Sequence, residues 1–425
     1  MNPRTILFMH QAFPGQFGSL AASLAAEGHK VYALAMNPQK SLPGVSIARY
    51  APLREQPDGM APLLQDIDAK LIRAESAFQA MQGLKKHGIN PDVIYAHPGW
   101  GEAMFLKDVW PDARVVMYAE WFYNLRGQEV NFDPAMPPLS EELQLRLHLK
   151  NTPFLHALSM ADAAISPTEW QKSRFPAWAQ EKIQVVHDGI NLAELAGVRP
   201  RGLGIPSQGL KLKKGMPIIT YASRHLEPVR GFHYFMRSLP AILRANPEAH
   251  VIVMGRDSGI GNLGYGADNP NQESWRKTME KELGDSVDWK RVHFLGMLER
   301  KLYLAMLKLS ACHVYLTTPF ILSWSFLEAA ALGMPIVASD TAPVREMSNL
   351  SGLKFVNFND PEGIAQAVNR TLRQPQQDYS AENIEKLKDM DHRVALPKIR
   401  NILLAGSNSF DIGGGNIESL ILLDD

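Results

Sequence analysis

The chain has 425 residues, with 44 basic and 44 acidic side chains and therefore a formal net charge of zero. A chain of this length is too long for a single hydrophobic core and is typical of two domains. The zero net charge excludes a global electrostatic attraction to nucleic acid or to an anionic membrane.

The first half of the chain alternates buried strand-like segments with helix-like segments. The predicted strands are residues 5–10, 30–36, 91–97, 113–120, 162–168 and 183–190. The predicted helices are residues 15–29, 63–87, 101–110 and 145–161. Repeated strand–helix–strand units with short connections indicate a parallel sheet that is covered by helices on both faces.

The pattern lapses between residues 191 and 216, where Gly, Pro and Lys are frequent, and then restarts. The second set of predicted strands is 217–223, 249–255, 291–297, 312–318 and 336–339, and the predicted helices are 231–247, 299–311, 325–332, 361–374 and 381–405. We therefore expect an α/β protein with two doubly wound Rossmann-like domains. The expected boundaries are a domain at 1–195, a linker at 196–216, a domain at 217–385, a closing helix at 386–405 and a weakly ordered tail at 406–425.

Candidate site residues in the first half follow predicted strands, because ligands of such sheets bind beyond the carboxyl ends of the strands. Gly15 lies in the first turn, where free backbone N–H groups can face an anion, although a plain tight turn is the alternative. His97 and the neighbouring Trp100 follow another strand and are candidates for a substrate contact. Glu120 ends the next strand and can orient a hydroxyl or act as a base, or else pair with a nearby arginine.

Two arginines follow the first strand of the second half. Arg224 stands at the strand end, and Arg230 precedes Gly231 and a predicted helix. Guanidinium groups beside a helix N-terminus suit a diphosphate, because their fork of donors matches phosphate oxygens. The alternative is a pair of solvated surface arginines.

Glu328 is the single acid in a long apolar run, "TTPFILSWSFLEAAALGMPIVASD" at 317–340, apart from the final Asp340. Ser325 and Glu328 fit a capping box, with Ser at the N-cap and Glu at N3, and Gly333 is the predicted end of the helix. The alternative is that the carboxylate contacts a ligand.

The cysteine and metal-ligand patterns predict no disulfide and no metal site. Cys312 is the single cysteine, and its apolar surroundings predict an inert packed thiol. No second His or Cys stands at ligand spacing from His97, and no Asp-x-Asp metal motif occurs beyond "DMD" at 389–391. We expect no metal and no cofactor other than a substrate.

Together these segments resemble the retaining glycosyltransferases of family 4, in particular the bacterial glycogen-synthase and mannosyltransferase group. The resemblance rests on "SRHLEPVRG" at 223–231, "DGI" at 188–190 and "SFLEAAALGMPIVASDTAPVRE" at 325–346. It extends over residues 4–385 and is strongest from 217 to 346. It implies the GT-B fold, with two facing Rossmann-like domains, the N-terminal one for the acceptor and the C-terminal one for a nucleotide sugar.

The resemblance also assigns roles to single residues. Arg224 stands where the family has its phosphate-binding arginine, and Arg230 replaces the usual lysine that neutralises the leaving diphosphate. Glu328 matches the second Glu of the family's E-x7-E motif, which contacts the nucleotide ribose. Gly15 falls in the N-terminal glycine loop, and Glu120 stands close to the position of a histidine near the sugar.

One departure from the family affects the donor-sugar contact. The first Glu of E-x7-E is Phe320 here, and the glycines that follow it in the family are Ile321 and Ser323. Phe320 cannot bond a sugar hydroxyl. Trp324 or the backbone amides beside Ser323 are the candidates to replace that contact, by stacking or by donation.

The sequence therefore predicts a retaining hexosyltransferase that uses a nucleoside diphosphate sugar, with a saccharide or lipid-linked hydroxyl as acceptor, in surface polysaccharide or glycan synthesis. The alternatives are a catalytically weak nucleotide-binding or scaffold protein and a sugar-nucleotide epimerase. We expect no nucleic-acid partner.

The expected location is the cytoplasm, because residues 1–17 lack a signal-peptide pattern and no apolar run is long enough to span a bilayer. Peripheral contact with the inner membrane face through the basic residues of the helix at 63–87 is an alternative to an ordinary solvated face.

Overall fold

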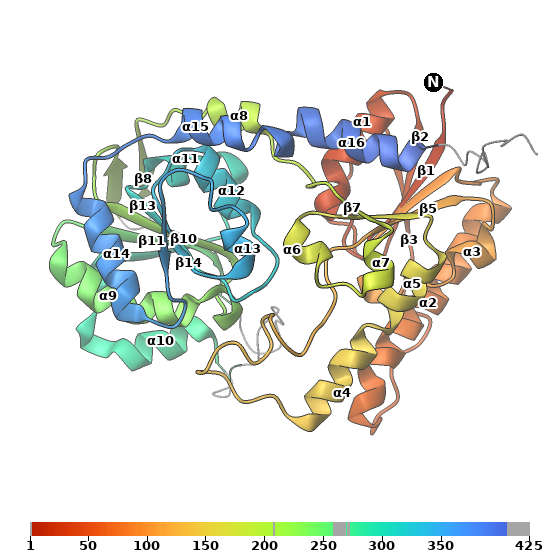
Figure 1. The fold of residues 1–425 in the computed structure, drawn as a ribbon, viewed down its shortest axis with the longest axis horizontal. Coiled ribbons are helices and arrows are strands. Elements are labelled where there is room, and N and C mark those ends of the chain that lie inside the picture. The colour runs from red at the N-terminus through yellow and green to blue at the C-terminus, as the bar shows by residue number, and fades with distance from the viewer. Residues whose placement is uncertain (1, 207–208, 258–268, 270–272, 406–425) are drawn as a thin grey trace, which may run out of the picture.

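The computed structural model describes residues 2–206, 209–257, 269 and 273–405. In this part of the chain, two α/β domains face each other, and each is built on one parallel sheet (Figure 1). The predicted pair of doubly wound domains is therefore confirmed. Among the described residues, no helix has both the length and the apolar character needed to cross a membrane.

The N-terminal sheet has seven parallel strands in the order β3-β2-β1-β4-β5-β6-β7. Its strands are β1 (Thr5–Met9), β2 (Lys30–Ala35), β3 (Val45–Arg49), β4 (Val93–Ala96), β5 (Arg114–Tyr118), β6 (Ala163–Ser166) and β7 (Ile183–Val185). The central strands β1, β4 and β5 are almost wholly buried, as expected for a sheet covered on both faces. Strand β3 was not predicted, because it lies at the sheet edge and is only partly buried.

The helices of this domain fall mostly where they were predicted. They are η1 (Gly15–Phe17), α1 (Gly18–Ala26), α2 (Pro62–Lys86), η2 (Pro98–Trp100), α3 (Leu106–Val109), α4 (Glu141–Lys150), α5 (Thr152–Met160), α6 (Glu169–Lys172) and α7 (Ala177–Gln180). The single helix predicted at 145–161 is wrong: α4 ends before Asn151, and α5 begins with Pro153 in its first turn. Proline lacks the N–H that would continue the helical hydrogen bonds, so it starts a new helix.

The C-terminal sheet has six parallel strands in the order β12-β11-β10-β13-β14-β15. Its strands are β10 (Ile218–His225), β11 (His250–Arg256), β12 (Val292–Gly296), β13 (Cys312–Tyr315), β14 (Ile336–Ser339) and β15 (Leu353–Val356). Its helices are η4 (Pro228–Arg230), α9 (Phe232–Ala245), α10 (Trp275–Leu283), η5 (Gly284–Ser286), η6 (Trp289–Arg291), α11 (Arg300–Leu309), α12 (Trp324–Ala331), α13 (Ala342–Arg345) and α14 (Pro361–Arg373). Cys312 is fully buried in β13, and burial raises the pKa of its thiol to about 12, in line with the predicted inert thiol.

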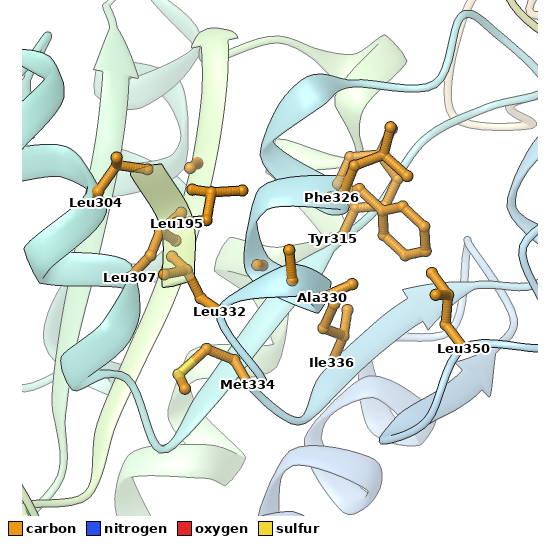
Figure 2. Close-up of a cluster of buried hydrophobic side chains, with 14 of the residues drawn as sticks. Leu195, Leu304, Leu307, Tyr315, Phe326, Ala330, Leu332, Met334, Ile336 and Leu350 are labelled. Atoms are coloured by element: carbon orange, nitrogen blue, oxygen red, sulfur yellow. The ribbon is translucent and has the colours of Figure 1, made fainter. Parts of the chain in front are cut away.

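The segment between the sheets packs on the C-terminal domain. It contains α8 (Leu192–Ala196) and an antiparallel hairpin of β8 (Gly202–Ile205) and β9 (Leu210–Lys213), so most of the expected linker at 196–216 is folded. Leu195 and Leu212 are buried in the same cluster as Leu304 and Leu307 of α11, part of which Figure 2 shows. The alternation of apolar residues along both hairpin strands explains why this stretch does not remain a free linker.

The end of the described chain returns to the N-terminal domain. After α15 (Ser380–Lys386) and η7 (Lys388–Met390), helix α16 (His392–Leu404) lies beside α1, and Ile399 and Leu403 are buried in the N-terminal core (Figure 1). The expected closing helix at 386–405 thus comprises η7 and α16. The tail predicted at 406–425 lies outside the described residues.

The outgoing and returning segments meet where the chain passes between the domains. Ile190 forms a parallel bridge with Asp391, through an N–H bond from Ile190 to Met390 at 2.8 Å and one from His392 to the Ile190 carbonyl at 2.9 Å. The chain therefore crosses between the domains at two adjacent points.

Candidate active site

A pocket of about 340 Å³ opens at the carboxyl ends of β10, β11 and β12, beside the first turn of α12. Its lining combines strand-end backbone, two arginines and the start of α12: Ala222, Ser223, Arg224, Met254, Gly255, Gly296, Met297, Leu298, Arg300, Tyr303, Ser323, Trp324, Ser325 and Glu328. This is where ligands of doubly wound sheets bind. The predicted residues Arg224, Glu328, Ser323 and Trp324 all lie in this lining.

The first turn of α12 is capped by Ser323. Its Oγ accepts the N–H of Ser325 at 3.3 Å, and Trp324 is the first helical residue. The predicted capping box of Ser325 and Glu328 is therefore wrong, because the helix begins two residues earlier than Ser325 would require as N-cap. Glu328 lies a turn into the helix, and its carboxylate is free for other contacts.

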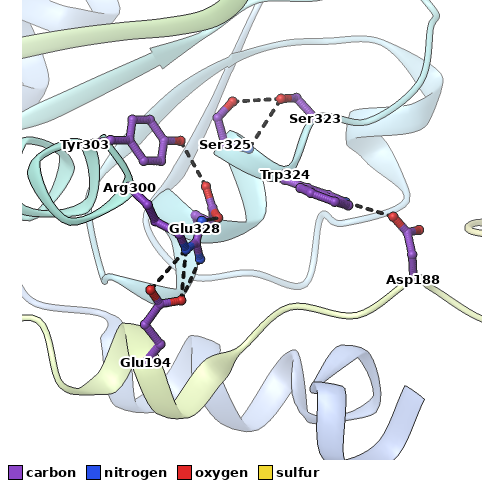
Figure 3. Close-up of polar contacts among 8 residues, drawn as sticks. All are labelled: Asp188, Glu194, Arg300, Tyr303, Ser323, Trp324, Ser325 and Glu328. Carbon is purple, nitrogen blue, oxygen red and sulfur yellow. Dashed lines mark hydrogen bonds and ion pairs between the residues drawn. The ribbon is translucent and has the colours of Figure 1, made fainter. Parts of the chain in front are cut away.

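Glu328 contacts two residues of α11 (Figure 3). Arg300 Nη1 donates to Oε1 at 2.7 Å, and the Tyr303 hydroxyl donates to Oε2 at 3.0 Å. The side chain is almost completely buried, and this burial raises the pKa of the carboxyl group, while Arg300 and then Tyr303 act in the opposite direction. Arg300 also donates to Glu194 through Nε at 3.0 Å and Nη2 at 2.8 Å.

Asp188, in the "DGI" stretch, links the pocket to the N-terminal domain. Its Oδ2 accepts the indole N–H of Trp324 at 3.0 Å, and its Oδ1 accepts the Tyr118 hydroxyl at 3.2 Å. Tyr118 is the last residue of β5, so one carboxylate contacts both domains. Trp324 nevertheless remains 43% exposed, and its ring is accessible from the pocket.

The two predicted phosphate-binding arginines differ in their surroundings. Arg224 is exposed at the end of β10 and lines the pocket. Arg230 is half-buried and lies outside the pocket lining: its Nη1 donates to Thr317 Oγ1 at 3.0 Å and to the Ile321 carbonyl at 2.8 Å. The guanidinium of Arg224 therefore lies at the pocket, whereas that of Arg230 is bonded through Nη1 to the loop before α12.

Four polar side chains of the N-terminal domain form a chain of hydrogen bonds at the strand ends. His97 Nδ1 accepts the N–H of Gly99, so its Nε2 carries the proton and donates to Glu120 Oε2 at 3.0 Å. Gln16 donates to Glu120 Oε1 at 3.1 Å. Both carboxylate oxygens of Glu120 are thus engaged, and the predicted residues His97 and Glu120 lie together.

His10 extends this chain. Its Nδ1 accepts the N–H of Ala12 at 3.0 Å, so its Nε2 donates to Gln16 Oε1 at 3.2 Å. Burial, His97 and Arg224 lower the pKa of His10 to about 3, although the bond with Gln16 opposes them, so the ring is neutral near pH 7.

Gly15 lies against this histidine. Its φ of +47° and the 2.6 Å from an added Cβ to His10 Nε2 both require glycine. The predicted turn is therefore shaped around His10, and Trp100 closes the other side of the cluster by stacking on His97 at 4.2 Å between ring centroids.

Phe320 packs between the domains. Its ring centroid lies 4.6 Å from that of Trp121, and these two residues form a buried aromatic cluster with Trp170. The Arg230 guanidinium lies 5.0 Å from the centre of the Phe320 ring. The residue that replaces the family's first motif Glu is therefore part of an interdomain contact.

Two acidic residues also connect the domains. Glu346, at the end of α13, accepts the backbone N–H groups of Glu169 and Trp170 at 2.9 Å each. Asp133 accepts the Tyr234 hydroxyl at 2.7 Å and lies 2.9 Å from His233 Nε2, both in the first turn of α9. The first contact joins α13 to α6, and the second joins the segment before α4 to α9, so each one connects the two domains.

Within the described parts of the chain, no group of three or more His, Cys, Asp or Glu residues is arranged to hold a metal ion.

Family models match both halves of the chain. Residues 27–195 match the Glycosyl transferase family 4 group, and residues 216–374 match the Glycosyl transferases group 1. The chain therefore belongs to the family 4 and group 1 glycosyltransferases. It is a retaining GT-B enzyme that transfers a sugar from a nucleotide sugar. No curated protein matches the chain in sequence.

Solved structures share the fold at low sequence identity. A sucrose-phosphate synthase from Thermosynechococcus elongatus matches with a TM-score of 0.65 at 17% identity, covering 94% of this chain and 98% of that one. A UDP-forming trehalose-phosphate synthase from Burkholderia vietnamiensis matches with a TM-score of 0.64 at 16% identity, covering 95% and 99%. An E. coli structure described as trehalose-6-phosphate bound with UDP-2-fluoro glucose matches with a TM-score of 0.62 at 14% identity, covering 94% and 98%. These likenesses confirm the GT-B architecture.

Several polar residues of the site were not predicted from the sequence. His10 follows β1 directly, just as His97 follows β4, so the same strand-end signal could have identified it. Arg300 and Tyr303 are three residues apart on α11 and share a helix face, but nothing in the sequence pairs that face with Glu328. Glu194 and Glu346 gave no signal, because each contacts a partner that is distant in the chain.

Proposed function

We propose that this glycosyltransferase moves a hexosyl unit from a nucleoside diphosphate sugar to a hydroxyl of a saccharide or lipid-linked acceptor. The observation that carries the proposal is the pocket at the carboxyl ends of β10, β11 and β12, which combines Arg224 with the buried carboxylate of Glu328. A cation and a hydrogen-bond acceptor in one pocket suit the diphosphate and the ribose of a nucleotide.

The C-terminal domain would bind the donor. Arg224 would contact the diphosphate at the exposed end of β10, where negative charge grows as the leaving group departs. Arg230, at the end of η4, would add positive potential beside the loop before α12, with Nε and Nη2 left for a phosphate oxygen after Nη1 has bonded that loop. Two guanidinium groups would perform the electrostatic role without requiring a metal.

The N-terminal domain would supply the groups near the sugar. Glu120 is a carboxylate held at both oxygens by Gln16 and His97, so its position is fixed before a substrate arrives. An oriented negative charge stabilises the oxocarbenium-like transition state of glycosyl transfer. His97 and Trp100 would border the acceptor or the sugar, and Gly15, which lies against His10, would present its backbone to the donor.

The proposed acceptor is a saccharide or a lipid-linked saccharide, which would place the enzyme in surface polysaccharide or glycan synthesis in the cytoplasm. Helix α2 has Lys85 and Lys86 in its last turn, and these would favour transient contact with an anionic membrane face. Asp66 and Asp68, near the other end of the same helix, pair with Arg146 and Arg54, so α2 carries acidic as well as basic side chains.

A second candidate function is nucleotide binding without sugar transfer. Phe320 favours it, because the position of the family's sugar-binding acid is occupied by a ring that is buried against Trp121. Turnover of donor distinguishes the two functions, because only the transferase releases nucleoside diphosphate.

The test is calorimetric binding of UDP and GDP, followed by a screen of UDP- and GDP-hexoses for release of the nucleoside diphosphate. UDP-sugars come first, because the solved structures of similar fold include UDP-forming enzymes. Arg224→Ala should weaken nucleotide binding by about ten- to a hundredfold, because it removes a charge-assisted contact worth roughly 1.5–3 kcal/mol. Arg201→Ala is the control, because Arg201 is also exposed but lies beside the β8–β9 hairpin. Equal binding by both variants and the parent would place the diphosphate elsewhere.

A further inference from the structure

A carboxylate in the position of Glu328 presents a physical problem. It is 4% exposed and lines the pocket, and a buried negative charge is unfavourable unless it is paired and hydrogen-bonded. Its ability to accept hydrogen bonds from a ribose depends on the carboxylate remaining ionised and correctly aimed. Its α11 neighbours must therefore perform both tasks.

We propose that Arg300 is a positioning residue of the nucleotide site, which holds the Glu328 carboxylate in place for the ribose and is itself held by Glu194. The inference rests on the proposed function, because it assigns a ribose contact to Glu328. It adds two residues, Arg300 and Glu194, that the sequence had not assigned to the site.

The contacts of Arg300 favour a positioning role over the simpler role of a free phosphate ligand. Its Nε and Nη2 both donate to Glu194, in a two-pronged arrangement that fixes the plane of the guanidinium. Its Nη1 donates to Glu328 Oε1. All three nitrogens are therefore engaged by carboxylates within the protein (Figure 3).

Glu194 provides a rigid support for this arrangement. It lies on α8, whose Leu192 and Leu195 are buried in the C-terminal core. The backbone N–H of Glu194 is itself bonded by the side chain of Asn191, the N-cap of that helix. The direction of Arg300 is thus set by a short helix that is anchored in the same domain as the pocket.

Glu328 keeps capacity for a ligand after these contacts. A carboxylate offers about four lone-pair positions, of which Arg300 and Tyr303 occupy one on each oxygen. The remaining positions are available to two neighbouring hydroxyl groups. Of these two contacts, Tyr303 supplies a neutral hydrogen bond and Arg300 supplies the compensating positive charge.

Removing that charge should make nucleotide binding depend on pH. The charged and titratable groups that face Glu328 are Arg300, Tyr303 and Glu194, and burial already raises the pKa of Glu328 against the effect of Arg300. Without Arg300, burial and the negative charge of Glu194 remain and raise that pKa further. The ionised form accepts the ribose, so affinity is present at high pH and is lost as the pH falls through the raised pKa.

The experiment measures calorimetric affinity for UDP and for 2′-deoxy-UDP between pH 6 and 9 in the full-length chain. In the parent, Glu328 should stay ionised over this pH range and should therefore add no pH dependence to the affinity for UDP. The parent should also bind UDP more tightly than the deoxy analogue. Arg300→Met should bind UDP about tenfold more weakly at pH 6 than at pH 9, and should lose the discrimination at pH 6. Arg300→Lys, which keeps the charge, should restore binding at pH 6. The affinity of Glu194→Gln for UDP at pH 6 should lie between those of Arg300→Lys and Arg300→Met.

Arg345→Met is the matched control. Arg345 forms a two-pronged pair with Asp340 in the same domain, but at an exposed position away from the pocket. This variant should bind both nucleotides as the parent does at every pH. Suppose that the parent binds UDP and discriminates against the deoxy analogue, and that Arg300→Met has the same pH profile as the parent. This result overturns the positioning role of Arg300 but leaves the proposed function standing. A parent that binds neither nucleotide overturns the proposed function as well.

Discussion

Replacing Glu346 should shift the balance between closed and open arrangements of the two domains. Its carboxylate on the C-terminal domain accepts two backbone N–H groups at the start of α6 in the N-terminal domain. Glu346→Ala removes both hydrogen bonds, and Glu346→Gln keeps one acceptor oxygen. The closed arrangement should therefore be destabilised partly by Glu346→Gln and more strongly by Glu346→Ala.

The magnitude follows from the number and setting of these bonds. A hydrogen bond to a charged group contributes about 1.5–3 kcal/mol, and the low end applies here because Glu346 is half-buried and Glu169 is exposed. Two bonds then favour closure by about 3 kcal/mol, which is about a hundredfold in the ratio of closed to open molecules. Glu346→Gln should reduce that ratio by about tenfold.

The assay measures the distance between two spin labels, one on each domain, by pulsed electron paramagnetic resonance. Leu143→Cys on α4 and Arg370→Cys on α14 place labels at exposed positions, and the native Cys312 is fully buried and will not react. Glu346→Ala should broaden the distance distribution toward longer values, whereas Glu362→Ala, at an exposed acid of α14, should not. Identical distributions in the parent and Glu346→Ala would refute the assigned role of this contact.

Two further substitutions probe one residue of each domain. Glu120→Gln should lower the rate of sugar transfer by about a hundredfold while nucleotide affinity changes by less than about threefold, because an oriented charge acts on the transition state; equal losses of rate and affinity would contradict this separation. Phe320→Ala should lower the free energy of unfolding by about 3 kcal/mol in a denaturant titration, because it opens a cavity among Trp121, Trp170 and Arg230; a loss below about 1 kcal/mol would mean that the cluster is not tightly packed.

The architecture could be predicted because it depends on local patterns. Buried strands such as β1 and β4 appear as apolar runs, and α12 ends near Gly333, whose φ of +81° suits a helix terminus. The errors arose where a local pattern admits two outcomes. Ser323 and Ser325 are both good N-caps, and the sequence cannot show which of them the loop presents to the free N–H groups.

The site could be predicted only in part, for a related reason. Strand-end position identified Arg224, His97 and Glu120 as candidates, because parallel strands bring their carboxyl ends to one edge. The pairings of these residues depend on contacts between distant segments. Glu194 and Glu328 are joined through Arg300, and no spacing in the sequence reports a contact made through a third residue.

The double crossing at Ile190 and Asp391 has a mechanical consequence. A single flexible connection would let one domain swing and twist freely about the other. Here two adjacent connections are bonded to each other through backbone groups, so together they form one hinge. Rotation about the line through them remains easy, and twisting or sliding would have to break the bridge. Opening and closing should therefore follow a single path, which brings the strand ends of the two sheets back to the same relative position in every catalytic cycle.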